Sequence, residues 1–169
     1  MDLTERLIDH DLWLTDEILK RATMLTDAQL DLPLAVGDTW VEEVGETTLR
    51  GLLDHLVFNK ENWTAALTGA AIALDVDRSV PGLRRRFAAT APKFRDVVEG
   101  IRERGDWDTR FTVTTADPHE TFTHGSAIAH VVTFSAHRRE LVIGALRKLG
   151  ITDLGYGDPK DWERLRWST

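Results

Sequence analysis

The sequence predicts an all-α protein, a four-helix bundle with a small β-hairpin before the last helix. Four long segments repeat apolar residues every three or four positions, which is the spacing of one face of an α-helix. A short Thr-rich segment between the third and fourth helices alternates with a period of two instead, as a strand does. At 169 residues, the chain is expected to form a single domain, residues 1–169, whose core needs no disulfide to be stable.

The first two helices are predicted over residues 3–24 and 47–67, with Thr47 or Thr48 as the cap of the second. In the first, His10 and Glu17 lie at the edge of an apolar stripe. That stripe contains Leu3, Leu7, Leu14 and Ile18. The apolar face of the second helix contains Leu49, Leu52, Leu56, Trp63 and Leu67.

The third helix is predicted over residues 80–104, because Pro81 suits a first turn. Pro92 is expected to kink this helix or to split it in two. Its apolar face contains Leu83, Phe87, Ala91, Phe94, Val98 and Ile101. The fourth helix is expected to begin after Thr123 or Gly125 and to end at Gly150, since glycine commonly follows the last turn of a helix.

The hairpin is predicted from residues 110–115 and 120–123, which flank an Asp-Pro turn. Residues 33–46 are expected to be irregular. Residues 151–169 are expected to be an extension docked on the bundle, because Trp162 and Trp167 would be unusual in a disordered end.

Composition excludes several classes of protein. A net charge of −7 argues against general nucleic-acid binding, and the one basic cluster, residues 84–86, is interpreted as a solvated helix face. The chain has no cysteine, which excludes a thiol nucleophile and is compatible with a cytoplasmic location. No signal peptide and no membrane span are expected, because the first segment is acidic and no long apolar run occurs.

Arg138 is the most informative single residue, because it falls near the middle of the apolar stripe of the fourth helix. A buried guanidinium stays charged and is costly unless a carboxylate or a bound anion compensates it. Two interpretations follow. Arg138 either pairs with an acidic side chain of another helix, for which Glu17 is the first candidate, or binds the carboxylate or phosphate of a ligand. His10 belongs to the same group of candidates, because it shares the face of Glu17.

Two stretches carry a resemblance to a known family. Residues 130–139 (HVVTFSAHRR) are similar to the last helix of the DinB/YfiT-like superfamily, usually written H-x-x-x-H-x-x-H-H-R. Residues 48–63 (TLRGLLDHLVFNKENW) resemble the second helix of that family, and residues 9–13, 25–30 and 155–159 also match it. The resemblance covers nearly the whole chain and implies a bundle of up-down-down-up order, with homodimers common among the relatives.

The resemblance also implies a candidate metal site. Members with a metal hold a divalent ion such as zinc or nickel with one histidine of helix two and two histidines of helix four. The corresponding residues here are His55, Phe134 and Arg138. Phenylalanine cannot coordinate a metal and a guanidinium does not normally do so. His55 is therefore the ligand carried over, and the usual metal site is expected to be absent or rebuilt.

Other side chains remain candidates for a polar interior cleft. Asn59 lies one turn after His55. His130 and His137 lie seven residues apart, a separation of about 10 Å along a helix, which is awkward for two ligands of one metal. They are either metal ligands that line one groove or two histidines at a helix interface or at the surface.

Three functional hypotheses stay open. The resemblance implies a divergent member of the family's metal-dependent transferases and isomerases, which act with low-molecular-weight thiols. The alternatives are a small-ligand-binding or stress-response protein without the metal site, and a purely structural ion pair in its place.

Overall fold

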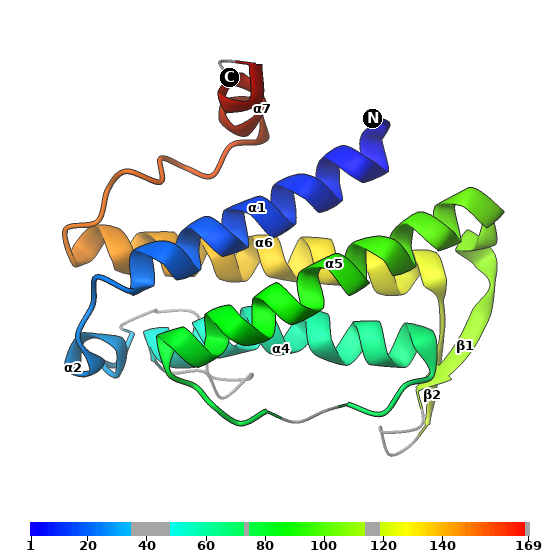
Figure 1. Ribbon diagram of the computed structural model, residues 1–169, viewed down its shortest axis with the longest axis horizontal. Helices are drawn as coiled ribbons and strands as arrows, with labels where there is room; N and C mark the ends of the chain where they lie inside the picture. Colours follow the sequence, from blue (N-terminus) through cyan, green and yellow to red (C-terminus); the bar gives the residue numbers. More distant parts are fainter. Residues whose placement is uncertain (35–47, 73–74, 114–118, 168–169) are drawn as a thin grey trace.

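The computed structural model describes residues 1–34, 48–72, 75–113 and 119–167. Four long helices form the bundle: α1 (Leu3–Ala22), α4 (Leu49–Thr68), α5 (Val80–Arg104) and α6 (His124–Lys148). In Figure 1, α1 and α6 run in one direction, and α4 and α5 run in the other. The predicted four-helix bundle of up-down-down-up order is therefore confirmed.

Shorter elements complete the fold. They are α2 (Asp27–Leu30), the 3-10 helix η1 (Asp106–Asp108), β1 (Arg110–Val113), β2 (Glu120–Thr123) and α7 (Pro159–Trp167). The two strands form the predicted hairpin before the last long helix, and they pair antiparallel with Arg110 opposite Thr123. Residues 114–118, which include the end of the first predicted strand and most of its predicted turn, lie outside the described residues. So do residues 35–47, which include most of the segment expected to be irregular, 33–46.

The ends of the helices follow from side-chain caps and glycines. The Thr48 hydroxyl accepts a hydrogen bond from the Gly51 amide at 3.1 Å, which decides between the two caps proposed for α4. Thr123 caps α6, and Gly150 follows the end of that helix with a φ of 89°. A positive φ is easily adopted only by glycine, so the predicted stop is confirmed.

The buried face of α1 differs from the predicted stripe. Leu14 and Ile18 are buried, but Leu3 is 71% exposed and Leu7 is 43% exposed. Ile8, one position further along, takes the place of Leu7 in the core. Because α1 packs against both α5 and α6, its buried face is set by two neighbours and not by one row of leucines.

Pro92 does not split α5, which runs as one helix of 25 residues. Proline removes the hydrogen bond to the carbonyl four residues earlier, here that of Ala88. Both Pro92 and Ala88 are exposed, so water can satisfy the free carbonyl. Of the two alternatives expected at Pro92, a kink or a split, the split is therefore wrong.

The C-terminal segment lies against α1. His10 Nε2 is 2.8 Å from the carbonyl oxygen of Gly157. Trp162 of α7 is 5% exposed, and its ring lies edge-on to that of His10 with centroids 5.8 Å apart. Trp167 is 76% exposed, so one of the two tryptophans expected to dock this segment does so.

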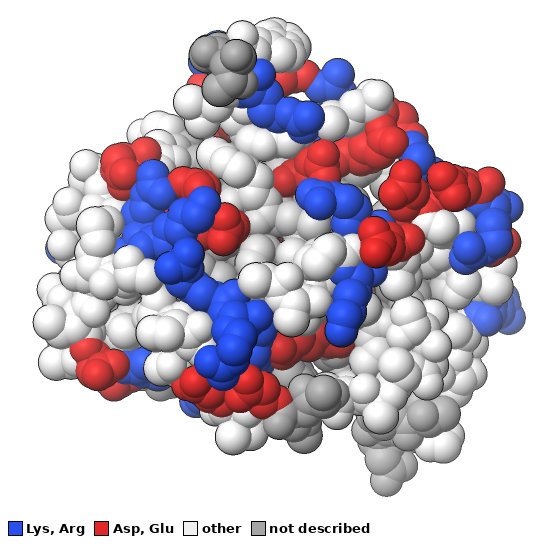
Figure 2. Space-filling model, viewed as in Figure 1, with Lys and Arg blue, Asp and Glu red and all other residues white. Residues whose placement is uncertain are grey.

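Charged side chains of both signs are interleaved on the face that Figure 2 shows. The basic cluster of residues 84–86 is only partly a solvated face. Arg85 pairs with Asp75 and Asp77, whereas Arg86 is 6% exposed and binds Glu61 and Asp54. Within the described part of the chain, no helix has the length and apolar character needed to cross a bilayer.

Candidate functional site in the bundle interior

A group of buried polar and charged side chains lies in the interior of the bundle, and we call it the Asp11 cluster: Asp11, Lys60, Ser135 and Arg139. These residues come from α1, α4 and α6, and none is more than 4% exposed. Asp11 Oδ2 lies 2.9 Å from Lys60 Nζ, and Oδ1 binds the guanidinium of Arg139. Lys60 also donates a hydrogen bond of 3.2 Å to the hydroxyl of Ser135. One carboxylate thus joins three helices.

Burial changes the acid–base behaviour of this cluster. It lowers the pKa of Lys60 to about 7, and the charge of Arg138 adds to the shift. Burial also lowers the pKa of Arg139 to about 10. The Asp11 carboxylate opposes both shifts by favouring the charged forms. Of the two cations of the cluster, Lys60 is therefore the one that titrates closer to neutral pH.

A second polar region borders this cluster, and we call it the α4–α6 seam: His55, Asn59, His130, Phe134 and Arg138. Arg138 is 3% exposed, which confirms the predicted burial of a guanidinium on this helix. Its guanidinium carbon lies 5.9 Å from the centre of the Phe134 ring. Asn59 is 5% exposed, and its Nδ2 has no hydrogen-bond partner in the described structure.

His130 is the base of the seam. Its ring stacks on Phe134 with centroids 4.3 Å apart and lies 5.3 Å from the ring of Trp63. Burial lowers its pKa most, followed by the charges of Arg138 and His55. Its imidazole is therefore neutral at pH 7 and can accept a proton. The structure thus brings together His55, His130 and Arg138, three residues that the sequence singled out.

The remaining candidates lie elsewhere or at the edge of the seam. His137 is exposed and contacts Phe134 edge-on at 6.2 Å between centroids. His10 lies beside Arg139, whose charge together with burial lowers the His10 pKa, and it binds the C-terminal segment. Because a carbonyl oxygen can only accept, His10 is the donor in that contact.

Glu17 is not part of the polar interior. Its two carboxylate oxygens pair with Lys20 at 2.8 Å and with Arg21, both on its own helix. The expected pairing of Glu17 with Arg138 is therefore corrected: Glu17 pairs on its own helix, and among the carboxylates of the described residues Asp11 is the buried one. Six positions separate the two acids, which turns them to different sides of α1.

The family's metal site does not fit the residues present. Of the three corresponding positions, only His55 carries a metal-ligating atom, since the others are Phe134 and Arg138. Among the described residues, no group of three or more His, Cys, Asp or Glu side chains is placed to hold a metal ion. Instead of metal ligands, the seam offers a neutral imidazole base, His130, and a guanidinium cation, Arg138, beside aromatic rings.

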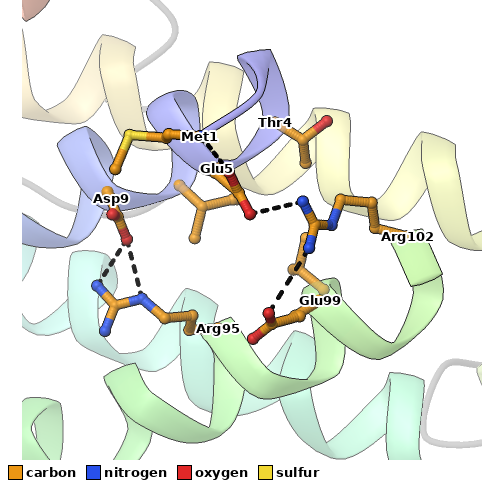
Figure 3. Close-up of a pocket in the computed structure, with 9 residues that line it drawn as sticks. Met1, Thr4, Glu5, Asp9, Arg95, Glu99 and Arg102 are labelled. Atoms are coloured by element: carbon orange, nitrogen blue, oxygen red, sulfur yellow. Dashed lines mark hydrogen bonds and ion pairs between the residues drawn. The ribbon is translucent and has the colours of Figure 1, made fainter.

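The described residues form several cavities at the surface of the bundle. One of about 550 Å³ lies between the hairpin, α4 and α6, and includes Trp63, Phe122 and His130 in its wall. Another of about 440 Å³ lies between α1 and α5. Figure 3 shows that its charges bind one another, Arg95 with Asp9 and Arg102 with neighbouring acids. The hairpin cavity is the one that shares a residue with the seam.

Sequence reasoning missed Asp11, Lys60 and Arg139 as interior residues. A signal for Lys60 was available, because it lies four residues after Leu56 in a row that continues through Thr64. A lysine in such a row is either a chain whose head reaches the surface or a buried charge, and only the neighbouring helices decide. Periodicity alone could not distinguish them.

The fold and interior define an α-helical bundle with a buried polar seam between its second and fourth long helices. Residues 12–142 match the family model of the DinB superfamily, and the chain belongs to that superfamily. No curated protein and no solved structure matched the chain.

Proposed function

We propose that this protein binds a small anionic molecule at the α4–α6 seam, in place of the divalent metal of its relatives. A low-molecular-weight thiol that carries a carboxylate is the ligand class that fits the superfamily and the seam together. The observation that best supports the proposal is that Arg138, a guanidinium only 3% exposed, lies in the seam. After burial, its charge is the next largest cause of the lowered pKa of both Lys60 and His130. A site whose positive potential acts on two neighbouring bases favours an anion.

The residues of the seam supply distinct parts of such a site. Arg138 can bind a carboxylate with two parallel hydrogen bonds. The Asn59 amide adds an uncharged donor. Because His130 is neutral, it can take the proton of a bound thiol, which leaves a thiolate and an imidazolium. The thiolate is then the nucleophile of a transfer reaction, and the nearby guanidinium stabilises its negative charge.

The test measures the binding of N-acetylcysteine by calorimetry. Two analogues, each without one of the two functional groups, probe the two halves of the site. The methyl ester lacks the carboxylate and the S-methyl derivative lacks the thiol. Arg138→Gln is expected to weaken binding of the acid by tenfold or more, about the value of a hydrogen bond to a charged group. Arg138→Lys should recover part of that loss, and Arg95→Gln on the surface of α5 should change nothing.

Proton transfer from the bound thiol can be measured separately from binding, because the chain has no cysteine. The ultraviolet absorbance of a thiolate therefore comes from the ligand alone. We expect bound N-acetylcysteine to ionise at a lower pH than the free thiol, and His130→Gln to abolish this shift while the carboxylate still binds. Binding without the shift in the wild type would identify a ligand-binding protein with no activated thiol.

Two results would overturn the proposal. The first is a folded Arg138→Gln protein, with unchanged circular dichroism, that binds N-acetylcysteine as tightly as the wild type. The second is stoichiometric zinc or nickel in the purified protein that is lost in His55→Ala, because a metal would then occupy the seam.

A further inference from the structure

We propose that the cavity between the hairpin, α4 and α6 is a binding site for a planar aromatic or heteroaromatic group with an uncharged hydrogen-bonding substituent. The cavity has a volume of about 550 Å³, within the range of pockets that enclose small ligands. Trp63 of α4, Phe122 of β2 and His130 of α6 contribute rings to its wall. This inference does not depend on the anion site, with which it shares only His130.

The aromatic side chains that line the cavity favour the binding of another aromatic ring. The Trp63 indole meets Phe122 edge-to-face, at 5.7 Å between centroids and 72° between planes. The same indole lies 5.3 Å from His130 at an angle of 54°. Aromatic pairs favour such tilted geometries, and each is worth about 0.5–1.5 kcal/mol beyond the area that it buries. A planar ligand ring would extend a cluster of rings that three separate elements hold in place.

Polar groups at the edge of the cavity indicate which hydrogen-bonding substituent the ring of the ligand should carry. The wall includes the Asn62 amide and the Glu120 carboxylate in addition to the His130 imidazole. The amide both donates and accepts, a carboxylate only accepts, and neutral histidine does one of each. A carboxamide or amino group on the ring satisfies this set, since it offers N–H donors to Glu120. A bare hydrocarbon ring would form no hydrogen bond with these groups.

The cavity is separate from the Asp11 cluster. Ala127, at the first turns of α6, is 1% exposed and forms part of the wall. The hairpin covers the side of Trp63, because Phe111 and Phe122 both contact its ring, at 6.4 and 5.7 Å. A ligand there touches the hairpin and two helices without entering the charged interior.

The experiment compares benzamide with cyclohexanecarboxamide, which carries the same amide on a ring that is not aromatic. Binding is followed by the indole N–H signals of the six tryptophans in nuclear magnetic resonance spectra. The Trp63 signal is assigned by its loss in Trp63→Phe. We expect benzamide to shift this signal and to bind about threefold or more tightly than the cyclohexane analogue. Adenine, a heteroaromatic probe, should shift the same signal.

The variants separate this site from the anion site. Phe122→Leu removes a ring while it keeps an apolar side chain, and it should reduce the preference for benzamide. Glu120 is exposed, so Glu120→Gln is expected to fold and should weaken both amides. Arg138→Gln should leave benzamide binding within twofold. Trp167→Phe is the control, because Trp167 is 76% exposed and lies outside the cavity.

The inference is overturned if the two amides bind equally, or if benzamide shifts all tryptophan signals to the same extent. It is also overturned if the folded Phe122→Leu protein keeps the full preference for benzamide, or if the folded Glu120→Gln protein binds both amides as tightly as the wild type. Loss of N-acetylcysteine binding in Arg138→Gln, with benzamide binding intact, would support the two sites as separate.

Discussion

Replacing Lys60 by methionine should remove a specific pH dependence from the stability of the fold. Burial and Arg138 lower the Lys60 pKa from 10.5 to about 7 in the folded protein. Between these two values the unfolded chain binds more protons than the folded chain. The free energy of unfolding therefore rises with pH in this window, and Lys60 contributes no slope below it because it is then charged in both states.

The size of the effect follows from the pKa difference. Each pKa unit corresponds to about 1.4 kcal/mol, so over the full window the free energy of unfolding changes by about 5 kcal/mol. Because the Asp11 carboxylate opposes the shift, this value is an upper bound. Between pH 7 and 9 the folded protein loses the Lys60 proton, and we expect the free energy of unfolding to rise by about 2 kcal/mol.

The assay is urea unfolding at pH 7, 8 and 9 of the wild type, Lys60→Met and Lys93→Met. Lys93 is exposed on α5, so its variant should follow the wild type. Lys60→Met should be more stable than the wild type at pH 7, and its advantage should shrink as the pH rises. Asp11 keeps Arg139 as its partner in this variant, so no carboxylate is left buried alone. A constant difference between Lys60→Met and the wild type from pH 7 to 9 would refute the reasoning.

Two further predictions concern single contacts. Asp11→Asn should destabilise the protein by about 3–5 kcal/mol in urea unfolding, because it leaves buried cations uncompensated, whereas Asp9→Asn on the surface of the same helix should cost less than about 1 kcal/mol. Gly157→Ala should detach the C-terminal segment, seen as faster limited proteolysis there, because the new Cβ would lie 2.5 Å from Leu14. Gly155→Ala carries a similar backbone strain with open space around it, so equal proteolysis of the two variants would contradict this explanation.

The sequence by itself determined the four long helices and their order. Apolar periodicity, the caps Thr48 and Thr123 and the stop at Gly150 are local features, and each depends on residues within about one turn of helix. The resemblance of residues 130–139 and 48–63 placed the chain in its superfamily, and the burial of Arg138 followed from its position on one helix.

Only the tertiary structure decided which charges share the interior. Asp11 and Glu17 are both acids of α1, and periodicity favoured Glu17 as the interior one, yet Asp11 is the acid that reaches Lys60 and Arg139. That choice depends on the rotation of α1 against two other helices, which a shift of one residue changes by about 100°. The hairpin cavity has the same origin, because its rings come from α4, β2 and α6 and meet only when the chain has folded.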